Sequence, residues 1–143
     1  MSVSNSIVAI LYILFMTGCM EDKDPALIRQ SISNTFDRAD SKVQIHPVVV
    51  VNKFAIADWM QDEKAGRALL TLKSGKWQLI LCGGKGLKDS MVLVQAGVPG
   101  NTAGSLVKQL AVAESTFSSS QVQHFDDFGP PVKFSDTNDH HPH

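Results

Sequence analysis

Residues 54–82 read FAIADWMQDEKAGRALLTLKSGKWQLILC, and the fold class follows from this stretch. It holds three apolar runs, at 54–60, 67–73 and 77–82. Only a few polar residues separate one run from the next. Connections this short join antiparallel strands, because a parallel crossover needs a dozen or more residues. The stretch therefore predicts three consecutive antiparallel strands, with a polar loop at 61–66.

A fourth strand is predicted just before this stretch. Val43-Gln44-Ile45 alternates between apolar and polar residues, and Pro47–Val51 is rich in β-branched residues. Both patterns are typical of strands. Asn52-Lys53 is short enough for a tight turn, although it lacks the glycine that is common in hairpins. We therefore expect a four-stranded antiparallel meander.

Helices are predicted before and after the meander. Asp24 is suited to be an N-cap with Pro25 at the first helical position, which opens a helix over 25–38. After the sheet, we expect helices at 87–96 closed by Gly97, from Asn101 or Thr102 to Glu114, and at 121–125 behind Ser118–Ser120, then a short edge strand at 132–134. This order predicts an α+β domain with the C-terminal helices packed on one face of the sheet.

Length and composition fit one folded domain. The chain has 143 residues, of which 43% are hydrophobic, enough for a real core. Its 13 basic and 14 acidic residues are balanced, and no basic patch is clustered along the sequence. Proteins that bind nucleic acid normally carry such a patch. We therefore expect no nucleic acid partner.

The N-terminus resembles a bacterial lipoprotein signal. Ile7–Phe15 is an apolar run of nine residues, whereas a membrane-spanning helix needs about 20. Its length fits the apolar region of a signal peptide. Thr17-Gly18-Cys19 then resembles a lipobox, with Met16 where Leu is usual. The first six residues contain no Lys or Arg, and the alternative is a buried N-terminal helix in which Cys19 is packed.

This interpretation divides the chain into four parts. We expect a signal peptide at 1–19, a tether at 20–24, a single domain at 25–134 and a flexible His/Asp-rich tail at 135–143. Lipid on Cys19 would make the membrane a partner. The protein would then be anchored in the bacterial cell envelope, facing the periplasm or the exterior.

Cys82 is the only other cysteine, so it has no partner if Cys19 carries lipid. Such a thiol is either a small buried hydrophobe or a reactive group, for instance a metal ligand. The glycine-rich residues 83–86 after it match neither the Walker nor the dinucleotide pattern. The chain also lacks a Cys-x-x-Cys motif. We expect no enzyme activity, and an activity built on Cys82 ranks last among our hypotheses.

The C-terminal tail is the strongest chemical signal. It carries His140, His141 and His143, with Asp136 and Asp139 just upstream. Imidazoles at such spacing can bind Cu(II), Ni(II) or Zn(II). The alternatives are a solvated tail with incidental affinity and a remnant of expression tagging. Binding by this tail would fade below about pH 6, where imidazoles take up protons.

Two other residue groups have ordinary structural interpretations. His46 stands at a strand start, where we expect an exposed or half-buried edge residue rather than a ligand. Trp59 and Met60 are adjacent on a predicted strand, so they point to opposite faces and do not line one pocket. One of the two is expected to face the core.

Several motifs between Ala26 and Phe134 resemble those of a family of bacterial envelope proteins known as copper uptake system-associated proteins. The matching motifs are Ala57-Asp58-Trp59 with Gln61, Gly66-Arg67-Ala68-Leu69-Leu70, Trp77 with Leu81-Cys82, Gly84 and Leu87-Lys88, and Ala96-Gly97-Val98-Pro99. The resemblance implies an association with copper-handling systems, and it brings no established ligand or catalytic residues. The histidine tail lies outside it.

Two alternative hypotheses for the function are therefore open. The first is an envelope-anchored accessory protein of copper uptake or handling, with copper as its ligand and a copper transporter or periplasmic copper protein as its partner. Its candidate metal ligands are Cys82, Met60 or Met91, and the tail residues His140, His141 and His143. The alternative is a non-catalytic interaction module of a membrane complex, with incidental metal affinity. That module would offer an open sheet face with Trp59 or Trp77.

Overall fold

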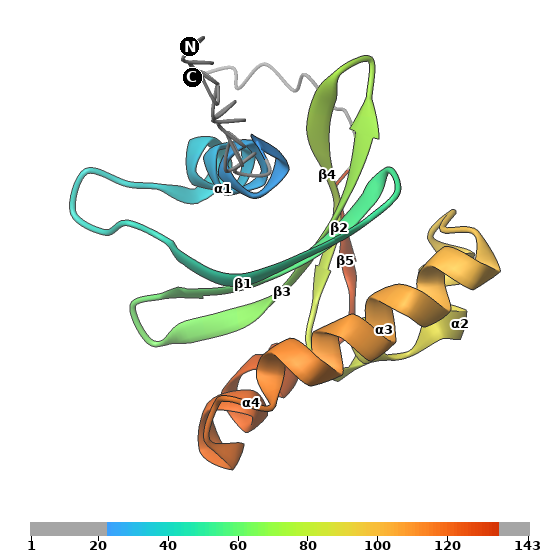
Figure 1. Cartoon of the computed structure of the whole chain (residues 1–143). Coiled ribbons are helices and arrows are strands. Elements are labelled where there is room, and N and C mark those ends of the chain that lie inside the picture. The colour runs from blue at the N-terminus through green and yellow to red at the C-terminus, as the bar shows by residue number, and fades with distance from the viewer. Residues whose placement is uncertain (1–22, 135–143) are drawn as a thin grey trace, which may run out of the picture.

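The computed structural model describes residues 23–134. One helix precedes a curved sheet, and the remaining helices follow it (Figure 1). The elements in chain order are α1 Lys23–Phe36, β1 Gln44–Val51, β2 Phe54–Gln61, β3 Lys64–Lys73, β4 Lys76–Gly83, the 3-10 helix η1 Lys85–Lys88, α2 Ser90–Gln95, α3 Gly100–Glu114, α4 Ser119–Asp126 and β5 Val132–Lys133. The predicted α+β class is confirmed, as is the short final strand.

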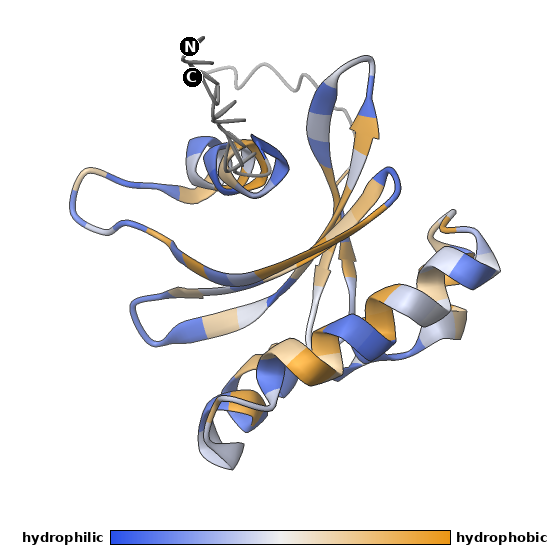
Figure 2. Ribbon diagram, in the orientation of Figure 1, coloured by the Kyte–Doolittle hydropathy of each residue, from blue (hydrophilic) through white to orange (hydrophobic). Residues whose placement is uncertain are grey.

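The sheet is an antiparallel meander with strand order β1-β2-β3-β4-β5. Its three tight turns each hold a residue other than glycine with positive φ: Asn52 at 54°, Asp62 at 55° and Ser74 at 52°. Asn and Asp tolerate this left-handed region better than most residues do. Asn52 therefore forms the first turn without the glycine that its sequence lacks. Hydrophilic residues occupy the hairpin tips and hydrophobic ones the middle of the sheet (Figure 2).

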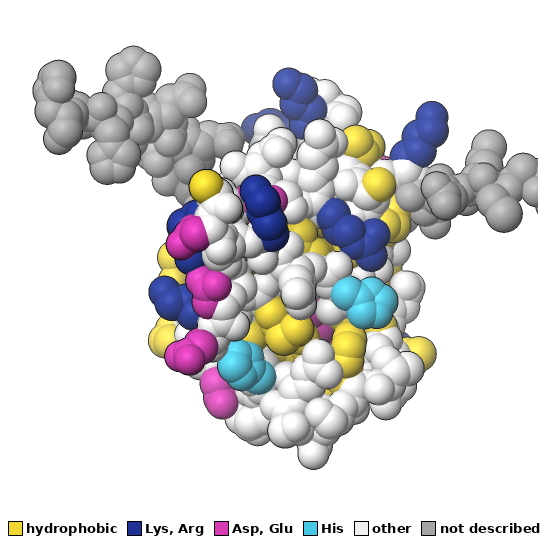
Figure 3. Space-filling model, turned by 90° about the vertical axis from the view of Figure 1, so that its left-hand side faces the viewer, with side chains coloured by type: hydrophobic (Ala, Val, Ile, Leu, Met, Phe, Trp, Pro, Cys, Tyr) yellow, Lys and Arg dark blue, Asp and Glu magenta, His cyan; other side chains and the backbone are white. Residues whose placement is uncertain are grey.

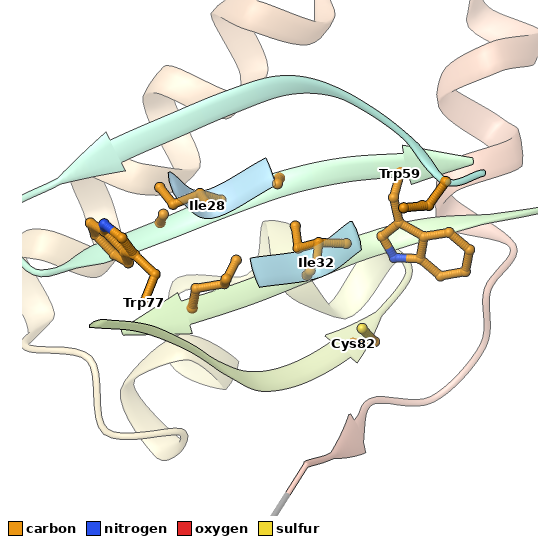
Figure 4. Packing of buried hydrophobic residues seen from close by; sticks show 10 residues of the cluster. Ile28, Ile32, Trp59, Trp77 and Cys82 are labelled. Carbon is orange, nitrogen blue, oxygen red and sulfur yellow. The ribbon is translucent and has the colours of Figure 1, made fainter. Parts of the chain in front are cut away.

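Helix α1 lies in the concave side of the sheet (Figure 1). Ile28 and Ile32 are four residues apart, on one face of the helix, and both are fully buried. They pack with strand residues that include Trp59, Trp77 and Cys82 (Figure 4). This first core cluster also contains Val43, Ala55, Ala57, Ala68 and Leu70.

The helices after the sheet cover its other face. Leu93 of α2 and Leu106 and Leu110 of α3 are fully buried there. Their second core cluster includes Val49, Ile56, Leu69 and Leu81 from four strands. The C-terminal helices thus pack on one face, as expected, while α1 takes the opposite one. Residues 65–70 of β3 are buried without alternation because both faces are covered.

The expectation of an open sheet face is therefore wrong. Trp59 and Trp77 are 8% and 6% exposed, because both lie in the cluster beneath α1. Neither indole is offered to a partner on an uncovered face. As predicted, one of the adjacent pair Trp59 and Met60 faces the core, and Met60 is half-buried.

Three predicted boundaries are also corrected. Helix α1 begins at Lys23, so Asp24 lies in its first turn, where it accepts a hydrogen bond from the Trp77 indole N–H (3.1 Å). The segment 61–66 is mostly strand, since β2 and β3 pair up to Gln61 and Lys64 and only Asp62-Glu63 turns. The helix expected at 87–96 is split, because Asp89 caps α2 by accepting the Met91 N–H.

Two end signals are confirmed. The Ser118 side chain caps α4 by accepting the Gln121 N–H (3.2 Å), and Gly97 follows α2 with φ 103°. Lys23 and Asp24, which were expected in the tether, are part of α1. No helix within residues 23–134 is both long and apolar enough to cross a membrane. The predicted signal peptide with Cys19 and the tail with His140, His141 and His143 lie outside the described residues.

Candidate functional site

Five ionisable side chains from five elements meet where α3 and α4 approach the sheet. We call them the buried charge cluster: Asp58 of β2, Arg67 of β3, Lys88 of η1, Glu114 of α3 and Asp126 of α4. Arg67 and Asp58 are fully buried, and Glu114 is 4% exposed. Charged side chains are almost never buried this deeply unless they are paired. The cluster is therefore the place in the described domain where ionisable side chains are most concentrated.

Arg67 is the centre of the cluster. Its guanidinium donates two hydrogen bonds to Glu114, from Nε to Oε1 at 2.7 Å and from Nη2 to Oε2 at 3.0 Å. Nη1 donates to Asp126 Oδ1 at 2.7 Å and to the Gly84 carbonyl at 3.1 Å. The Phe125 ring lies 5.8 Å from Cζ. Bidentate pairing of this kind suits arginine and no other cation, because the guanidinium is a planar fork.

Asp58 lies beside this pair without a good partner. Its Oδ1 is 3.6 Å from Arg67 Nε, and neither carboxyl oxygen has a hydrogen bond within the described residues. Burial raises the pKa of Asp58 to about 9. The nearby Glu114 carboxylate raises it as well, because its negative charge opposes the ionisation of a second carboxyl group beside it. These surroundings favour the protonated, neutral form of Asp58.

The rest of the cluster is balanced in charge. Lys88 Nζ lies 2.9 Å from Asp126 Oδ1. Burial alone would raise the pKa of Asp126, but hydrogen bonds from Lys88 and Arg67 outweigh it and lower the pKa. With Asp58 neutral, two cations face two carboxylates. These four charged groups satisfy one another, while Asp58 stays without a hydrogen bond, and the pairing favours a structural clamp over a catalytic site.

A glycine makes room for this clamp. A Cβ on Gly84 would lie 2.2 Å from the Asp126 carbonyl oxygen, which is backbone and has little freedom to move. Helix α4 therefore rests directly on the chain that follows β4. The clamp holds β3, η1, α3 and α4 in one unit.

Cys82, the predicted metal ligand, lies on the other side of the sheet. It is 2% exposed within the first core cluster (Figure 4). Burial raises the pKa of the Cys82 thiol to about 12, and the nearby Trp59 indole opposes this only in part. The thiolate is the form that binds metal. Copper binding by Cys82 stays a prediction, and its surroundings favour the small buried hydrophobe.

The other candidate ligands are spread over the surface. His46 is exposed, as expected, with its ring 5.9 Å from that of Phe117. Met91 is 63% exposed on α2, and Met60 is on β2. Within residues 23–134, no three His, Cys, Asp or Glu side chains are placed to hold a metal ion together.

A largely apolar hollow of about 500 Å³ lies on the surface beside the free edge of β1. It lies between the start of α1, at Pro25, and α3, at Lys108 and Val112. Val48–Val50 form its floor, and Val112 is 72% exposed. An edge strand with valines is open to pairing unless something covers it.

The buried charge cluster was not predicted from the sequence, although one of its pairs could have been. Asp58 and Arg67 are directly opposite in the β2–β3 register. A hairpin centred on Asp62-Glu63 would have placed them so, as an acid and a base inside two apolar runs. Their partners Glu114 and Asp126 carry no such local signal.

No family model, curated protein or solved structure matches the chain. The resemblance to copper uptake system-associated proteins therefore stays a prediction. Several of its motif residues do come together in the fold, since Arg67 binds the Gly84 carbonyl and Gly66 packs against Trp59.

Proposed function

We propose that this chain is an envelope-anchored, non-catalytic accessory protein of copper handling, in which the C-terminal histidines hold the metal. The observation that carries the proposal is the contrast between two parts of the chain. Ligand-type side chains stay apart in residues 23–134, whereas three imidazoles stand within residues 140–143. Imidazole is a good ligand for Cu(II).

The state of the domain supports a role without catalysis. Its one thiol is buried, and the pKa of that thiol is raised to about 12. Arg67 and Glu114 are buried and paired with each other, and Asp58 is buried beside them. A nucleophile or general base needs to reach a substrate, and these groups do not.

The test is a Cu(II) titration of the full chain, purified from membranes, against a competing chelator. We compare the natural chain with a variant in which His140, His141 and His143 are replaced by Asn. A matched control replaces His46 and His124 by Asn, which removes imidazoles from the domain only. We expect the tail variant alone to lose tight binding. Mass spectrometry of the Cys19 peptide tests the lipid anchor separately.

Two further variants sharpen the result. Cys82→Ser, titrated anaerobically with Cu(I), should bind as the natural chain does, because the thiol is buried. Lowering the pH from 7 to about 5 should weaken Cu(II) binding by the natural chain as its imidazoles take up protons. Loss of Cu(I) binding in Cys82→Ser would move the metal site into the fold and contradict the assignment to the tail.

The hollow beside β1 favours the second candidate, a non-catalytic interaction module with incidental metal affinity. Its apolar floor on a free strand edge is suited to contact with another polypeptide. Copper affinity weaker than micromolar in every form would leave this candidate. A photocrosslinker at Val112, compared with one at exposed Met91, would then identify the partner in intact membranes.

A further inference from the structure

Four lysines from three separate parts of the sequence lie at one end of the sheet. We call this the lysine end: Lys23, Lys53, Lys73 and Lys76, all exposed. The antiparallel register brings together the tip of the β1–β2 hairpin and the tip of the β3–β4 hairpin, and a hydrogen bond from Leu72 N–H to the Lys53 carbonyl (2.8 Å) links them. Figure 1 shows both tips on the side opposite the β2–β3 hairpin.

The start of α1 belongs to the same end. The Trp77 indole donates its hydrogen bond to Asp24, next to Lys23. Along the helix, Ile28 lies beside Trp77 and Ile32 lies toward Trp59, so α1 runs away from the lysine end (Figure 4). The chain therefore enters the folded domain where the lysines gather.

Carboxylates are concentrated elsewhere in the described domain. At the lysine end, Asp24 is half-buried and bonded to Trp77. Four exposed acidic residues lie at the opposite end, around the β2–β3 tip and the loop before β1, and Figure 3 looks onto that end. These residues are Asp37, Asp40, Asp62 and Glu63. Arg38, Lys42 and Lys64 are exposed at that end too, and Arg38 pairs with Asp40 and Asp62, so the charges there nearly balance. The lysine end carries four cations with Asp24 as the nearby carboxylate, and residues 23–134 hold 13 basic and 10 acidic residues.

The length of chain before α1 connects the lysine end to a membrane. Cys19 stands four residues before Lys23. Even fully extended, four residues span at most about 14 Å. If Cys19 carries lipid, the lysine end is held within roughly one to two Debye lengths of the bilayer at physiological salt. This is the largest separation that the link allows, and lysines that approach to within a Debye length are attracted to anionic lipid headgroups.

We propose that the lysine end seats on the anionic headgroups of the bilayer that anchors Cys19. This orientation rests on the anchor of the proposed function. The β1–β2 and β3–β4 tips then face the membrane, and the opposite end with Asp62 faces away from it. The lysine end is attracted by the negative charge of the headgroups, and no particular lipid is required.

The experiment uses the full lipidated chain in vesicles and a membrane-impermeant amine-acylating reagent. One set of vesicles is phosphatidylcholine, and the other contains equal parts of phosphatidylcholine and phosphatidylglycerol. Peptide mass spectrometry gives the acylation rate of each lysine, and Lys42, Lys64, Lys85 and Lys133 are internal controls. At low salt, we expect the lysine end to be acylated at least about threefold more slowly on the anionic vesicles, and this protection to vanish in high salt.

Matched variants test whether the lysines act together. Replacing Lys53, Lys73 and Lys76 by Gln should abolish the protection of Lys23. Replacing Lys42, Lys64 and Lys133 by Gln removes the same charge and should leave it intact. Equal acylation of all lysines on both vesicles would overturn the orientation, and so would protection at Lys42 and Lys64.

Failure of the anchor is distinguishable from failure of the orientation. A Cys19 peptide without lipid overturns the anchor and the seat that depends on it. A lipidated Cys19 without protection of the lysine end overturns the orientation alone. Protection that occurs in native membranes but not in anionic vesicles would assign the lysine end to an acidic protein instead and contradict the proposal.

Discussion

Asp58 and Trp59 are neighbours on β2, yet they lie in two different interiors. Trp59 faces α1 among apolar groups, stacked on Phe36 at 6.1 Å between ring centroids, with Phe128 edge-on at 5.7 Å. Asp58 faces the other side, among the charges that surround Arg67. Both carry a buried polar group without a hydrogen bond in the described part of the chain.

The two sites deal with that missing partner in different ways. The Trp59 indole stays neutral and is held by aromatic packing. The pKa of Asp58 is raised, because ionisation without a good partner in a buried place is unfavourable. The α1 side of the sheet is therefore stabilised by apolar packing, whereas the other side combines the second core cluster with the balanced charges around Arg67. Substitutions should separate these two kinds of stability.

The largest effect is expected from Arg67→Met. This change leaves Glu114 and Asp126 without their main cation inside the domain. Breaking a buried ion pair by removing one partner costs about 3–5 kcal/mol of unfolding free energy. Urea denaturation at pH 7 measures the loss. Arg38→Met is the control, since its pair with Asp62 is half-exposed, and we expect little change there. Similar losses in both variants would contradict the clamp.

The next effect is a pH dependence that Asp58→Asn should remove. The folded pKa of Asp58 is about 9, well above its ordinary value of about 3.9. Its contribution to stability is thus fully present below about pH 4 and is lost as the pH rises toward 9. The slope is at most about 1.4 kcal/mol per pH unit. Asp58→Asn should therefore gain stability relative to the natural chain between pH 5 and pH 8.

Urea denaturation at pH 5, 6.5 and 8 checks this slope. The pKa of Asp126 is shifted the other way, so its stabilising contribution is lost only as the pH falls through acid values, below this range. Asp40→Asn removes an exposed carboxyl and should follow the natural chain. Parallel stability curves for Asp58→Asn and the natural chain would mean that Asp58 is ionised in the fold.

The smallest effect is expected on the α1 side. Ile32→Val deletes one methylene from a fully buried side chain and should cost about 1 kcal/mol. Because no charge is involved, the loss should be the same at pH 5 and pH 8 and in high salt. Thermal or urea denaturation under these conditions measures it. A loss that changes with pH would show that the two sides of the sheet are coupled.

Local patterns were sufficient to predict the order of the elements. Short polar links between apolar runs dictate antiparallel hairpins, and Ser118 and Gly97 mark helix ends through their own backbone chemistry. The opposition of Asp58 and Arg67 also follows from the symmetry of one hairpin. These features depend on residues close in sequence, so the sequence contains the necessary information. The proposed anchor at Cys19 and the histidine tail likewise depend on sequence.

Packing between residues far apart in the sequence determined the features that local patterns did not predict. Arg67 meets Glu114 and Asp126 across 47 and 59 residues, and no local pattern announces that meeting. The burial of Cys82 and the gathering of lysines at one end of the sheet arise in the same way. Burial and charge depend on which distant groups share a space. Desolvation therefore shifts the pKa of Asp58 and of Cys82 only once the helices have closed over both faces of the sheet.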